Sequence, residues 1–374
     1  MFDVAIIGAG INGTATAHFL TQAGLKVALF DREGIAKGGS GAAGAFISPK
    51  ISKGGPLKAL IEEAYLYSLS FFRDNFPQHI TLSPQLHIAK YDDDNEKVAY
   101  FKTHTNIPVG DVPAESEALL QDAAKAFASV YIKNSGVVDT EKTCKRLSDE
   151  AEFFLEEITA IERVGEMWRV GPITAEKVVL ATGAYIPVVD EAYIKLRAIW
   201  GHRINIRTTT TVPHIIHHQV SLAPTTPEGL SAIGATHNVH YHPQLSDERY
   251  DMDAGRAELI KKATESVKLE NIEVVADFVG LRSGSNDYLP LLGRIADTAK
   301  SIDLHPELLK GVKVPKEELV YHPNLYMING VGGYGFVLGP YLAKQLSAHL
   351  INRSALDEQL DPTRFLYRWA KKQK

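Results

Sequence analysis

The fold is decided by the stretch FDVAIIGAGINGTATAHFLTQAGLKVALFD, residues 2–31. Its apolar run at residues 4–7 predicts a buried strand, and the glycine-rich turn after it opens a helical pattern that leads to a second strand ending at Asp31. Three glycines have the spacing that gives a dinucleotide-binding turn its tightness, its close approach to a pyrophosphate and its helix packing: Gly8, Gly10 and Gly13. The sequence therefore predicts a nucleotide-binding βαβ unit, with Asp31 binding the ribose hydroxyls. The alternative is a glycine turn that binds no nucleotide, and the matching strand and helix patterns on both sides weigh against it.

Length and composition bound the class of protein. A chain of 374 residues can form a large core and is expected to divide into two domains. Its 45% hydrophobic and 23% charged residues are typical of a globular protein, and no apolar run approaches the length of a membrane span. The first strand begins at Phe2, which leaves no room for a signal peptide. The single cysteine, Cys144, excludes an internal disulfide and fits a reducing compartment, so we expect a cytoplasmic protein with no membrane partner.

Net charge argues against nucleic-acid binding through the overall field of the protein, because it is −5 with a pI near 6.3. A local patch is still possible in the terminal segment RFLYRWAKKQK, residues 364–374. There, groups that pair with phosphates alternate with groups that stack on bases: Arg364, Arg368, Lys371, Lys372 and Lys374 among Phe365, Tyr367 and Trp369. Two interpretations stay open, a solvated tail and a contact with nucleic acid.

Strand and helix patterns alternate along the chain without an internal repeat. Helical periodicity is clearest at Pro56–Asn75, Asp253–Lys268 and Pro340–Leu350. Strand-like runs lie at Val130–Ile132, Lys177–Ala181, Ala198–Arg207, Ile272–Leu281 and Leu325–Ile328. The mixture predicts an α/β protein with an inserted sheet.

Two further glycine turns extend the signal of the first. One follows a buried strand, KVVLATGA at residues 177–184, at the carboxyl end where open α/β sheets bind ligands. The other, MINGVGGYG at residues 327–335, precedes the helix expected from Pro340, so its N–H groups can bind an electronegative ligand edge. A nicotinamide cofactor needs only the turn at residues 8–13, whereas an extended flavin dinucleotide can contact all three turns. Together they favour a flavin.

These residues resemble the D-amino-acid oxidase family of FAD enzymes, which includes glycine oxidase and sarcosine oxidase. Besides the first turn, the resemblance rests on GGSGAAGAF (38–46), SGVVDT (135–140), VVLATGAY (178–185), VGLRSGSNDYLPLLG (279–293) and GVGGYGF (330–336). Within that family, the chain most resembles the oxidase domain of the MnmC family of tRNA wobble-uridine modification proteins. The stretches that carry this likeness include GGSGAAGAFISPKISK (38–53), AIGATHNVHYHPQLSDERYDMDAGRAELI (232–260) and GLRSGSNDYLPLLGRIADTAKSIDLHPEL (280–308).

The resemblance implies an α/β fold, with a Rossmann-like FAD-binding domain of the D-amino-acid oxidase type and an inserted, mainly antiparallel β-sheet substrate domain. The discontinuous FAD-binding domain is expected at residues 1–76, 130–192 and 278–374, and the substrate domain at residues 77–129 and 193–277. The implied reaction oxidises the C–N bond of an N-substituted glycine. For an MnmC-like enzyme this glycine is the side arm of 5-carboxymethylaminomethyluridine in tRNA, which yields 5-aminomethyluridine and glyoxylate.

The implied cofactor is non-covalent FAD. Cys144 precedes an amphipathic stretch far from the terminal glycine turn, so a cysteinyl flavin is not supported. The residues expected to contact the cofactor are Gly8, Ala9, Gly10, Ile11, Asn12, Gly13, Asp31, Arg32, Gly39, Ser40, Val138, Thr182, Gly183, Arg282, Gly330, Gly332, Gly333, Tyr334 and Gly335.

Arg282 aligns with the family arginine that binds the substrate carboxylate through a bidentate pair, with a surface ion pair as the alternative. Hydride leaves the α-carbon of a neutral amine, and the imine hydrolyses without a dedicated general base. Lys50 and Lys53 are candidates to stabilise charge on dioxygen during reoxidation, with Lys53 preferred; solvated loop lysines are the alternative. Ser221 stands where relatives often have an active-site tyrosine, so substrate positioning is expected to differ.

Two groups of histidines raise the question of a metal site, at His214, His217 and His218 and at His237, His240 and His242. No metal is expected, because they lack a cysteine partner and an H-E-x-x-H spacing. The second group can instead line the substrate cavity and contact RNA.

Two other functions stay open: a small-molecule oxidase that makes hydrogen peroxide from glycine, sarcosine or a D-amino acid, and a flavin-binding protein that acts as a structural partner. The resemblance implies tRNA as a partner. Because Met1 directly precedes the first strand, the resemblance also implies that a methyltransferase partner would be a separate polypeptide. The sequence leaves the oligomeric state and the electron acceptor open.

Overall fold

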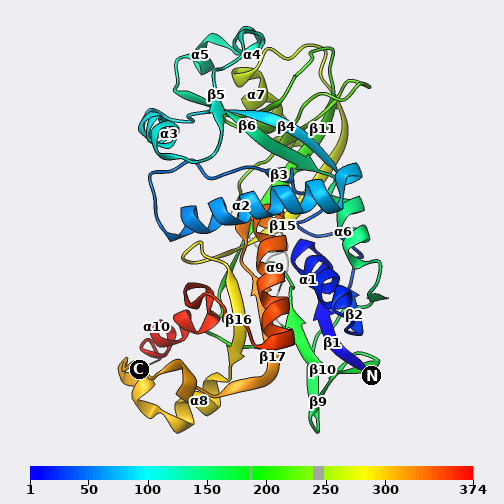
Figure 1. The fold of residues 1–374 in the computed structure, drawn as a ribbon, viewed down its shortest axis with the longest axis vertical. Helices are drawn as coiled ribbons and strands as arrows, with labels where there is room; N and C mark the ends of the chain where they lie inside the picture. The colour runs from blue at the N-terminus through cyan, green and yellow to red at the C-terminus, as the bar shows by residue number, and fades with distance from the viewer. Residues whose placement is uncertain (186–187, 239–247, 374) are drawn as a thin grey trace.

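The computed structural model describes residues 1–185, 188–238 and 248–373, which form two β-sheets with helices around them. Figure 1 shows the sheet that contains the first strand in the lower half of the molecule and the second sheet in the upper half. Helix α2 (Pro56–Asn75) lies between them, across α1 (Ile11–Gln22) and α9 (Gly335–Asn352). None of the described helices is long and apolar enough to cross a membrane.

The first sheet has the strand order β16-β17-β10-β1-β2-β7, and its strands from β17 to β7 are parallel. Strand β16 joins β17 antiparallel, and the hairpin β8–β9 joins β10. The strands of this sheet are β1 (Phe2–Ile7), β2 (Val27–Asp31), β7 (Glu152–Leu155), β8 (Ile161–Val164), β9 (Met167–Val170), β10 (Ile173–Leu180), β16 (Leu291–Ala296) and β17 (Tyr321–Asn329).

Alternate residues of the central strands enter two different cores, because apolar layers cover both faces of the first sheet. Val4 and Ile6 face the core that includes residues of α1, α2 and α9. Ala5 and Ile7 face the opposite core, which includes Trp168 and the C-terminal segment. A strand buried on both faces needs an unbroken apolar sequence, and this explains the run in β1.

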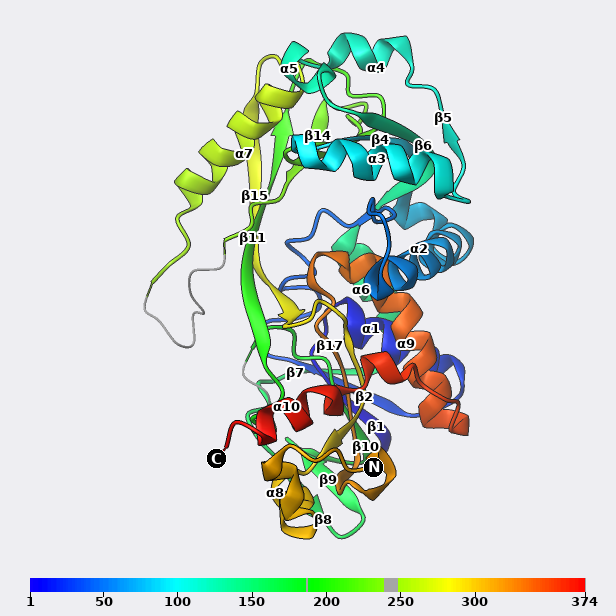
Figure 2. The ribbon, with the colours of Figure 1, turned by 90° about the vertical axis from the view of Figure 1, so that its left-hand side faces the viewer.

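The second sheet is mainly antiparallel, with the order β15-β11-β14-β13-β12-β4-β6-β3, and β5 pairs with β6. Its longest ladder, β11–β15, reaches down beside the first sheet in Figure 2. The strands are β3 (Phe46–Ile47), β4 (Ile80–Ile88), β5 (Val109–Gly110), β6 (Ser129–Val138), β11 (Leu196–Arg207), β12 (Ile215–His217), β13 (Ser221–Leu222), β14 (Leu230–Gly234) and β15 (Glu273–Ser285).

The remaining helices cover the outer surfaces of the two sheets. Helix α7 packs on β11 and β14 and supplies Leu259 and Ala263 to the apolar core of the second sheet. These helices are α3 (Asp92–His104), α4 (Ala114–Leu119), α5 (Asp122–Lys125), α6 (Thr140–Ser148), α7 (Met252–Ser266), α8 (Thr298–Leu304) and α10 (Leu366–Ala370).

The predicted helix at Pro56–Asn75 is confirmed with these bounds, and the five predicted strands lie within β6, β10, β11, β15 and β17, apart from one residue at two of their ends. The helix predicted from Pro340 instead begins at Gly335. The short 3₁₀ turn Gly332–Tyr334 leads directly into α9, so the glycine run is itself helical and Pro340 lies inside the helix.

The residue boundaries of the two proposed domains stay a prediction. That prediction assigns residues 130–192 to the cofactor-binding part, yet β6 pairs with β4 in the second sheet. The first strand of that segment therefore belongs to the other sheet. The sequence of β6 does not reveal this, because pairing partners are distant in the chain.

Candidate cofactor and substrate site

A cleft runs along the carboxyl ends of the parallel strands and reaches β15. Open α/β sheets bind ligands at this edge. Of the predicted cofactor contacts, the cleft is lined by Gly8, Gly10, Ile11, Asn12, Asp31, Arg32, Gly39, Ser40, Thr182, Gly183, Arg282 and Gly335. The lining residues that sequence reasoning missed include Glu33, Gly38, Ala43, Glu156, Glu157, Ile158, Tyr185, Val188, Ser283, Asn329, Val331 and Phe336.

The first glycine turn leaves no room for a side chain at Gly8 or Gly13. Gly8 has a φ of +108°, and a Cβ on it would lie 2.3 Å from the carbonyl oxygen of Ala181. A Cβ on Gly13 would lie 1.8 Å from the carbonyl oxygen of Gly8. The turn, α1 and the end of β10 are therefore packed backbone to backbone. Gly13 and Ala9 shape this turn without lining the cleft.

The N-terminus of α1 meets the cleft without a side-chain cap from its own N-cap residue, Gly10. Ser40 supplies a hydroxyl instead, and its Oγ accepts a hydrogen bond from the backbone N of Ile11 at 2.9 Å. A helix N-terminus attracts negatively charged oxygens through its N–H groups. The position fits a pyrophosphate, to which the Ser40 hydroxyl can donate.

Asp31 is fixed at the end of β2 by three backbone N–H groups. One carboxylate oxygen accepts from Ala9 at 2.8 Å, and the other accepts from Glu33 at 2.9 Å and from Gly34 at 3.1 Å. A carboxylate has about four acceptor sites, so Asp31 retains capacity for a ribose hydroxyl. The predicted role of this acid is compatible with its position in the cleft.

Beyond Asp31, the cleft ends at a cluster around Arg32. The Arg32 guanidinium lies 3.9 Å from the ring centroid of Tyr185 and pairs with Glu33 at 2.9 Å and Glu157 at 3.5 Å. Glu157 reaches this place because it follows β7, the neighbour of β2. Glu157 was not predicted, because the sequence of the short strand β7 does not indicate which strand it pairs with.

Val138, predicted as a cofactor contact, lies apart from the cleft. It ends β6, and its backbone N–H donates to the carbonyl of Ala45 at 3.1 Å. Val138 thus holds the start of β3. Residues 156–158, which follow β7, line the cleft beside the end of β2. The other predicted contacts outside the lining belong to the third glycine turn: Gly330, Gly332, Gly333 and Tyr334.

Asn329, a fully buried residue at the end of β17, ties the second and third glycine turns to β15. Its Oδ1 accepts from Ser283 Oγ and from the backbone N of Gly330, both at 2.8 Å, and its Nδ2 donates to the carbonyl of Gly183 at 3.0 Å. Three segments far apart in the chain therefore meet at one amide. The sequence signal was a polar residue at the end of an apolar run, directly before glycine.

Arg282 extends from β15 across Gly201 of β11 into the cleft. A Cβ at Gly201 would lie 2.6 Å from Arg282 Nη2, so the guanidinium uses the space that glycine leaves. Nη1 lies 3.3 Å from Nδ1 of His237. Burial lowers the pKa of Arg282, and none of the ion pairs within the described ranges includes it. This cation, held in a cleft with its forked donors unneutralised, suits a carboxylate ligand.

The two candidate lysines occupy different environments. Lys53 is exposed and pairs with Glu96 of α3 at 2.6 Å. Lys50 is half-buried, with its Nζ 5.7 Å from the ring centroid of Tyr334 in the third glycine turn. Burial and then the nearby Lys97 lower the pKa of Lys50. The preference for Lys53 stays a prediction, but these environments favour Lys50, because the charge of Lys53 is exposed and already paired with a carboxylate.

Lys50→Met is expected to slow reoxidation of the reduced enzyme by dioxygen about 100-fold, because it removes a cation from beside the third glycine turn. Lys53→Met should leave reoxidation close to the wild-type rate. Stopped-flow mixing of the reduced protein with oxygenated buffer measures both rates. A loss in Lys53→Met but not in Lys50→Met would assign the role to Lys53 after all.

The described histidines of the two predicted groups have partners within the protein. His217, on β12, lies between two hydroxyls, with Nδ1 2.5 Å from Ser221 Oγ and Nε2 3.1 Å from Ser48 Oγ. His214 and His218 likewise contact serine hydroxyls, at 3.2 and 2.8 Å. Ser221 thus holds an imidazole. His240 and His242 lie outside the described residues.

Two partly buried histidines should make stability depend on pH. Burial lowers the pKa of His87 to about 4 and that of His217 to about 3, whereas the unfolded chain has ordinary values near 6.5. Between about pH 6.5 and 4 the unfolded state binds more protons, so the free energy of unfolding should fall on acidification, by at most about 1.4 kcal/mol per pH unit for each histidine. Urea unfolding at several pH values measures this slope. His217→Gln should flatten it, and an unchanged slope in that variant would contradict the assignment.

The apolar and aromatic side chains of the terminal segment pack against the second core, whereas Arg368, Lys371 and Lys372 are exposed. Leu366 and Ala370 of α10 are fully buried in the second core, and three partly buried aromatics pack beside them: Phe365, Tyr367 and Trp369. Their side chains are therefore engaged within the protein. Lys374 lies outside the described residues.

A comparison with protein families matches residues 3–349 to the family described as FAD dependent oxidoreductase. The chain belongs to this family. It is therefore an FAD-dependent oxidoreductase, and the predicted D-amino-acid oxidase type of fold is confirmed.

Among curated proteins, the chain is 26% identical to the tRNA 5-methylaminomethyl-2-thiouridine biosynthesis bifunctional protein MnmC of Leptospira interrogans, over 99% of this chain and 61% of the relative. It is 24% identical to the MnmC protein of Legionella pneumophila, over 96% of this chain and 57% of the relative. It thus spans only part of the length of each. Among solved structures, glycine oxidase from Bacillus cereus has a TM-score of 0.75 at 20% identity, with 96% of this chain and 97% of that one covered, which shows a shared fold.

The cleft fits the cofactor of this family. Its lining includes both the Arg32 cluster and Arg282, together with Gly10 at the N-terminus of α1. Thr182 Oγ1, a buried atom of a lining residue, has no hydrogen-bond partner in the described structure. A buried hydroxyl without a partner is costly, so a ligand group at this place accounts for it.

Proposed function

We propose that this FAD-dependent oxidoreductase oxidises the C–N bond of an N-substituted glycine, and that the substrate is 5-carboxymethylaminomethyluridine at the wobble position of tRNA. The observation that carries the proposal is Arg282, a guanidinium in the cleft beside His237 with its charge unneutralised by the described residues. Its donors match the carboxylate of such an arm. The names of the MnmC relatives, which refer to tRNA 5-methylaminomethyl-2-thiouridine biosynthesis, support tRNA as the carrier.

Each part of the cofactor has residues that would hold it. Asp31 would bind the adenosine ribose, and Ser40 with the N-terminus of α1 would bind the pyrophosphate. The third glycine turn, fixed by Asn329, would contact the flavin end near Lys50.

FAD should be bound without a covalent link. Cys144 is buried on α6, outside the residues that line the cleft, and burial raises the pKa of its thiol to about 12. A thiol that stays protonated is a poor nucleophile. Acid precipitation should therefore release all flavin into the supernatant, and flavin that stays with the precipitate would contradict this.

In the proposed reaction, Arg282 binds the carboxylate and thereby fixes the α-carbon. Bound FAD would supply the acceptor for the hydride of that carbon, so two electrons would leave the substrate. The amine must be unprotonated, because its lone pair forms the new C=N bond as its N–H proton leaves. Water then adds to the carbon of the C=N bond and the C–N bond breaks, which gives glyoxylate and a primary amine. The protein contributes orientation.

Two classes of substrate tested side by side distinguish this proposal from the second candidate, a small-molecule amine oxidase. tRNA that carries the carboxymethylaminomethyl nucleoside and a panel of free glycine, sarcosine and D-amino acids are each incubated with flavin-replete protein. Nucleoside analysis should show the aminomethyl product, with a specificity constant well above that of any free amino acid. Unchanged nucleoside together with hydrogen peroxide from a free amino acid would favour the second candidate.

A further inference from the structure

An exposed tyrosine covered by a cation stands just beyond Arg282. Tyr288, in the turn between β15 and β16, is 64% exposed and has a φ of +67°. The guanidinium of Arg197 lies 4.5 Å from its ring centroid. A non-glycine residue in this left-handed region is strained unless its surroundings fix it.

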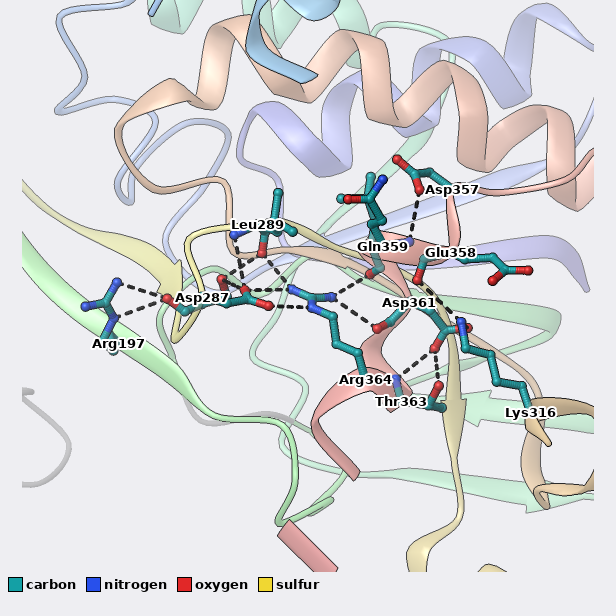
Figure 3. A network of polar contacts seen from close by, with 12 residues as sticks. Arg197, Asp287, Leu289, Lys316, Asp357, Glu358, Gln359, Asp361, Thr363 and Arg364 are labelled. Carbon is teal, nitrogen blue, oxygen red and sulfur yellow. Dashed lines mark hydrogen bonds and ion pairs between the residues drawn. The ribbon is translucent and has the colours of Figure 1, made fainter. Parts of the chain in front are cut away.

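A polar network fixes this turn, and Figure 3 shows it from close by. Asp287 accepts hydrogen bonds from Ser285 Oγ at 2.9 Å and from the backbone N of Leu289 at 3.2 Å. Arg364 of the terminal segment donates to both carboxylate oxygens of Asp287, at 2.8 and 3.1 Å, and to the carbonyl of Leu289 at 2.8 Å. The bidentate pair both orders the turn and neutralises its acid.

Arg197 and Arg282 lie on the same ladder, β11–β15. Arg282 is paired with Ile199 across the β11–β15 ladder, and Arg197 is paired with Gly284, so these side chains share one face of the ladder. Arg197 lies two residues before Ile199, about 7 Å along β11, and the Arg282 guanidinium leans the other way, toward Gly201.

The charge of this pair suits nucleic acid. Arg197 donates through Nε and Nη2 to the carbonyl of Ser285, at 3.2 and 3.0 Å, and pairs with no carboxylate of the described residues. It lies close enough to contribute, with Arg282, to the lowered pKa of His237, for which burial is the first cause. Positive charge beside an exposed aromatic ring is the combination that binds single-stranded nucleic acid, by stacking bases and pairing phosphates.

We propose that Tyr288 and Arg197 form a stacking platform for a nucleobase of the RNA substrate, at or next to the nucleoside whose arm reaches Arg282. The proposal rests on the proposed function and adds how the RNA is held. Arg364 is a positioning residue of the platform, because it acts through Asp287. The basic terminal segment thus serves RNA binding indirectly, by fixing the turn that presents the tyrosine.

The test compares Tyr288→Ala, Tyr288→Phe and Arg197→Met with Tyr100→Ala, which removes another exposed tyrosine, on α3. The probe is the anticodon stem-loop RNA that carries the carboxymethylaminomethyl nucleoside, and its Kd is measured without oxygen at fixed salt. Tyr288→Ala should raise the Kd by about 5- to 150-fold, the usual effect of removing one stacked aromatic. Tyr288→Phe should retain most of the affinity, since stacking needs the ring alone, and Tyr100→Ala should bind as the wild type does.

Failure of the platform and failure of the proposed function give different results. If the wild type converts the nucleoside while Tyr288→Ala binds the RNA as tightly as Tyr100→Ala, the platform is wrong and the function stands. If the wild type neither binds nor converts the RNA, both fall. Selective loss supports the platform, namely a fall in kcat/KM for the RNA that far exceeds any fall for a free N-substituted glycine. Equal losses on both substrates would overturn it, because they indicate damage to the site at Arg282.

Discussion

Arg282→Ala is expected to lower kcat/KM for an N-substituted glycine by roughly 30- to 5000-fold, the usual effect of removing one partner of a buried, hydrogen-bonded charge pair. The physical reason is that the substrate carboxylate would enter the cleft without a counter-charge. Steady-state kinetics with the wild type and the variant measure the effect. Because Arg282 orients the substrate as well as binding it, both KM and kcat should change.

Arg282→Lys separates charge from geometry at this site. A lysine restores a positive charge but cannot form the forked, two-bond contact, so we expect only partial recovery. The flavin content of both variants must equal that of the wild type, since Arg282 also lines the cofactor cleft. Near wild-type kcat/KM in Arg282→Ala at full flavin content would show that the carboxylate binds elsewhere.

Gly13→Ala is expected to remove bound flavin and to destabilise the protein by about 3 kcal/mol or more, because severe overpacking forces the backbone to move. The added Cβ would lie 1.8 Å from the carbonyl oxygen of Gly8, an atom that cannot give way without opening the turn. The flavin-to-protein absorbance ratio and urea unfolding measure the two effects. Binding of added FAD should be lost even where some folded protein survives.

Gly54→Ala is the matched control for the glycine turn. A Cβ at Gly54, in an exposed loop, meets no atom within 4 Å. Its flavin content and stability should therefore match those of the wild type. Equal behaviour of the two variants would mean that the packing of α1 against the turn is not what holds the cofactor.

The first βαβ unit could be predicted from sequence because its signals are local. The strand, the turn and the helix follow one another, and Gly8 and Gly13 are required by contacts within the unit itself or with the adjacent β10. Arg282 was predicted through a family resemblance rather than from physics, since its contacts with Gly201 and His237 depend on the pairing of β11 with β15 and on a distant loop.

Residues that act only through tertiary pairing escaped prediction. Asn329 and Glu157 line the cleft because of the order of the strands in the first sheet. That order cannot be predicted from any local sequence pattern. The preference for Lys53 over Lys50 could not take burial into account, because the sequence does not show which lysine is buried. The ion pair between Lys53 and Glu96 of α3 is a tertiary contact of the same kind. The packing of the terminal segment escaped prediction for the same reason: its aromatics pack in a core built by other strands.

The central claim is tested most directly by an anaerobic single turnover on tRNA. Oxidised protein is mixed with one equivalent of tRNA that carries 5-carboxymethylaminomethyluridine, and flavin absorbance, nucleoside content and glyoxylate are measured in the same sample. The account predicts that flavin is reduced in step with the appearance of one equivalent each of 5-aminomethyluridine and glyoxylate. Flavin that stays oxidised with this tRNA, in protein whose flavin is reduced by a free amino acid, would contradict it.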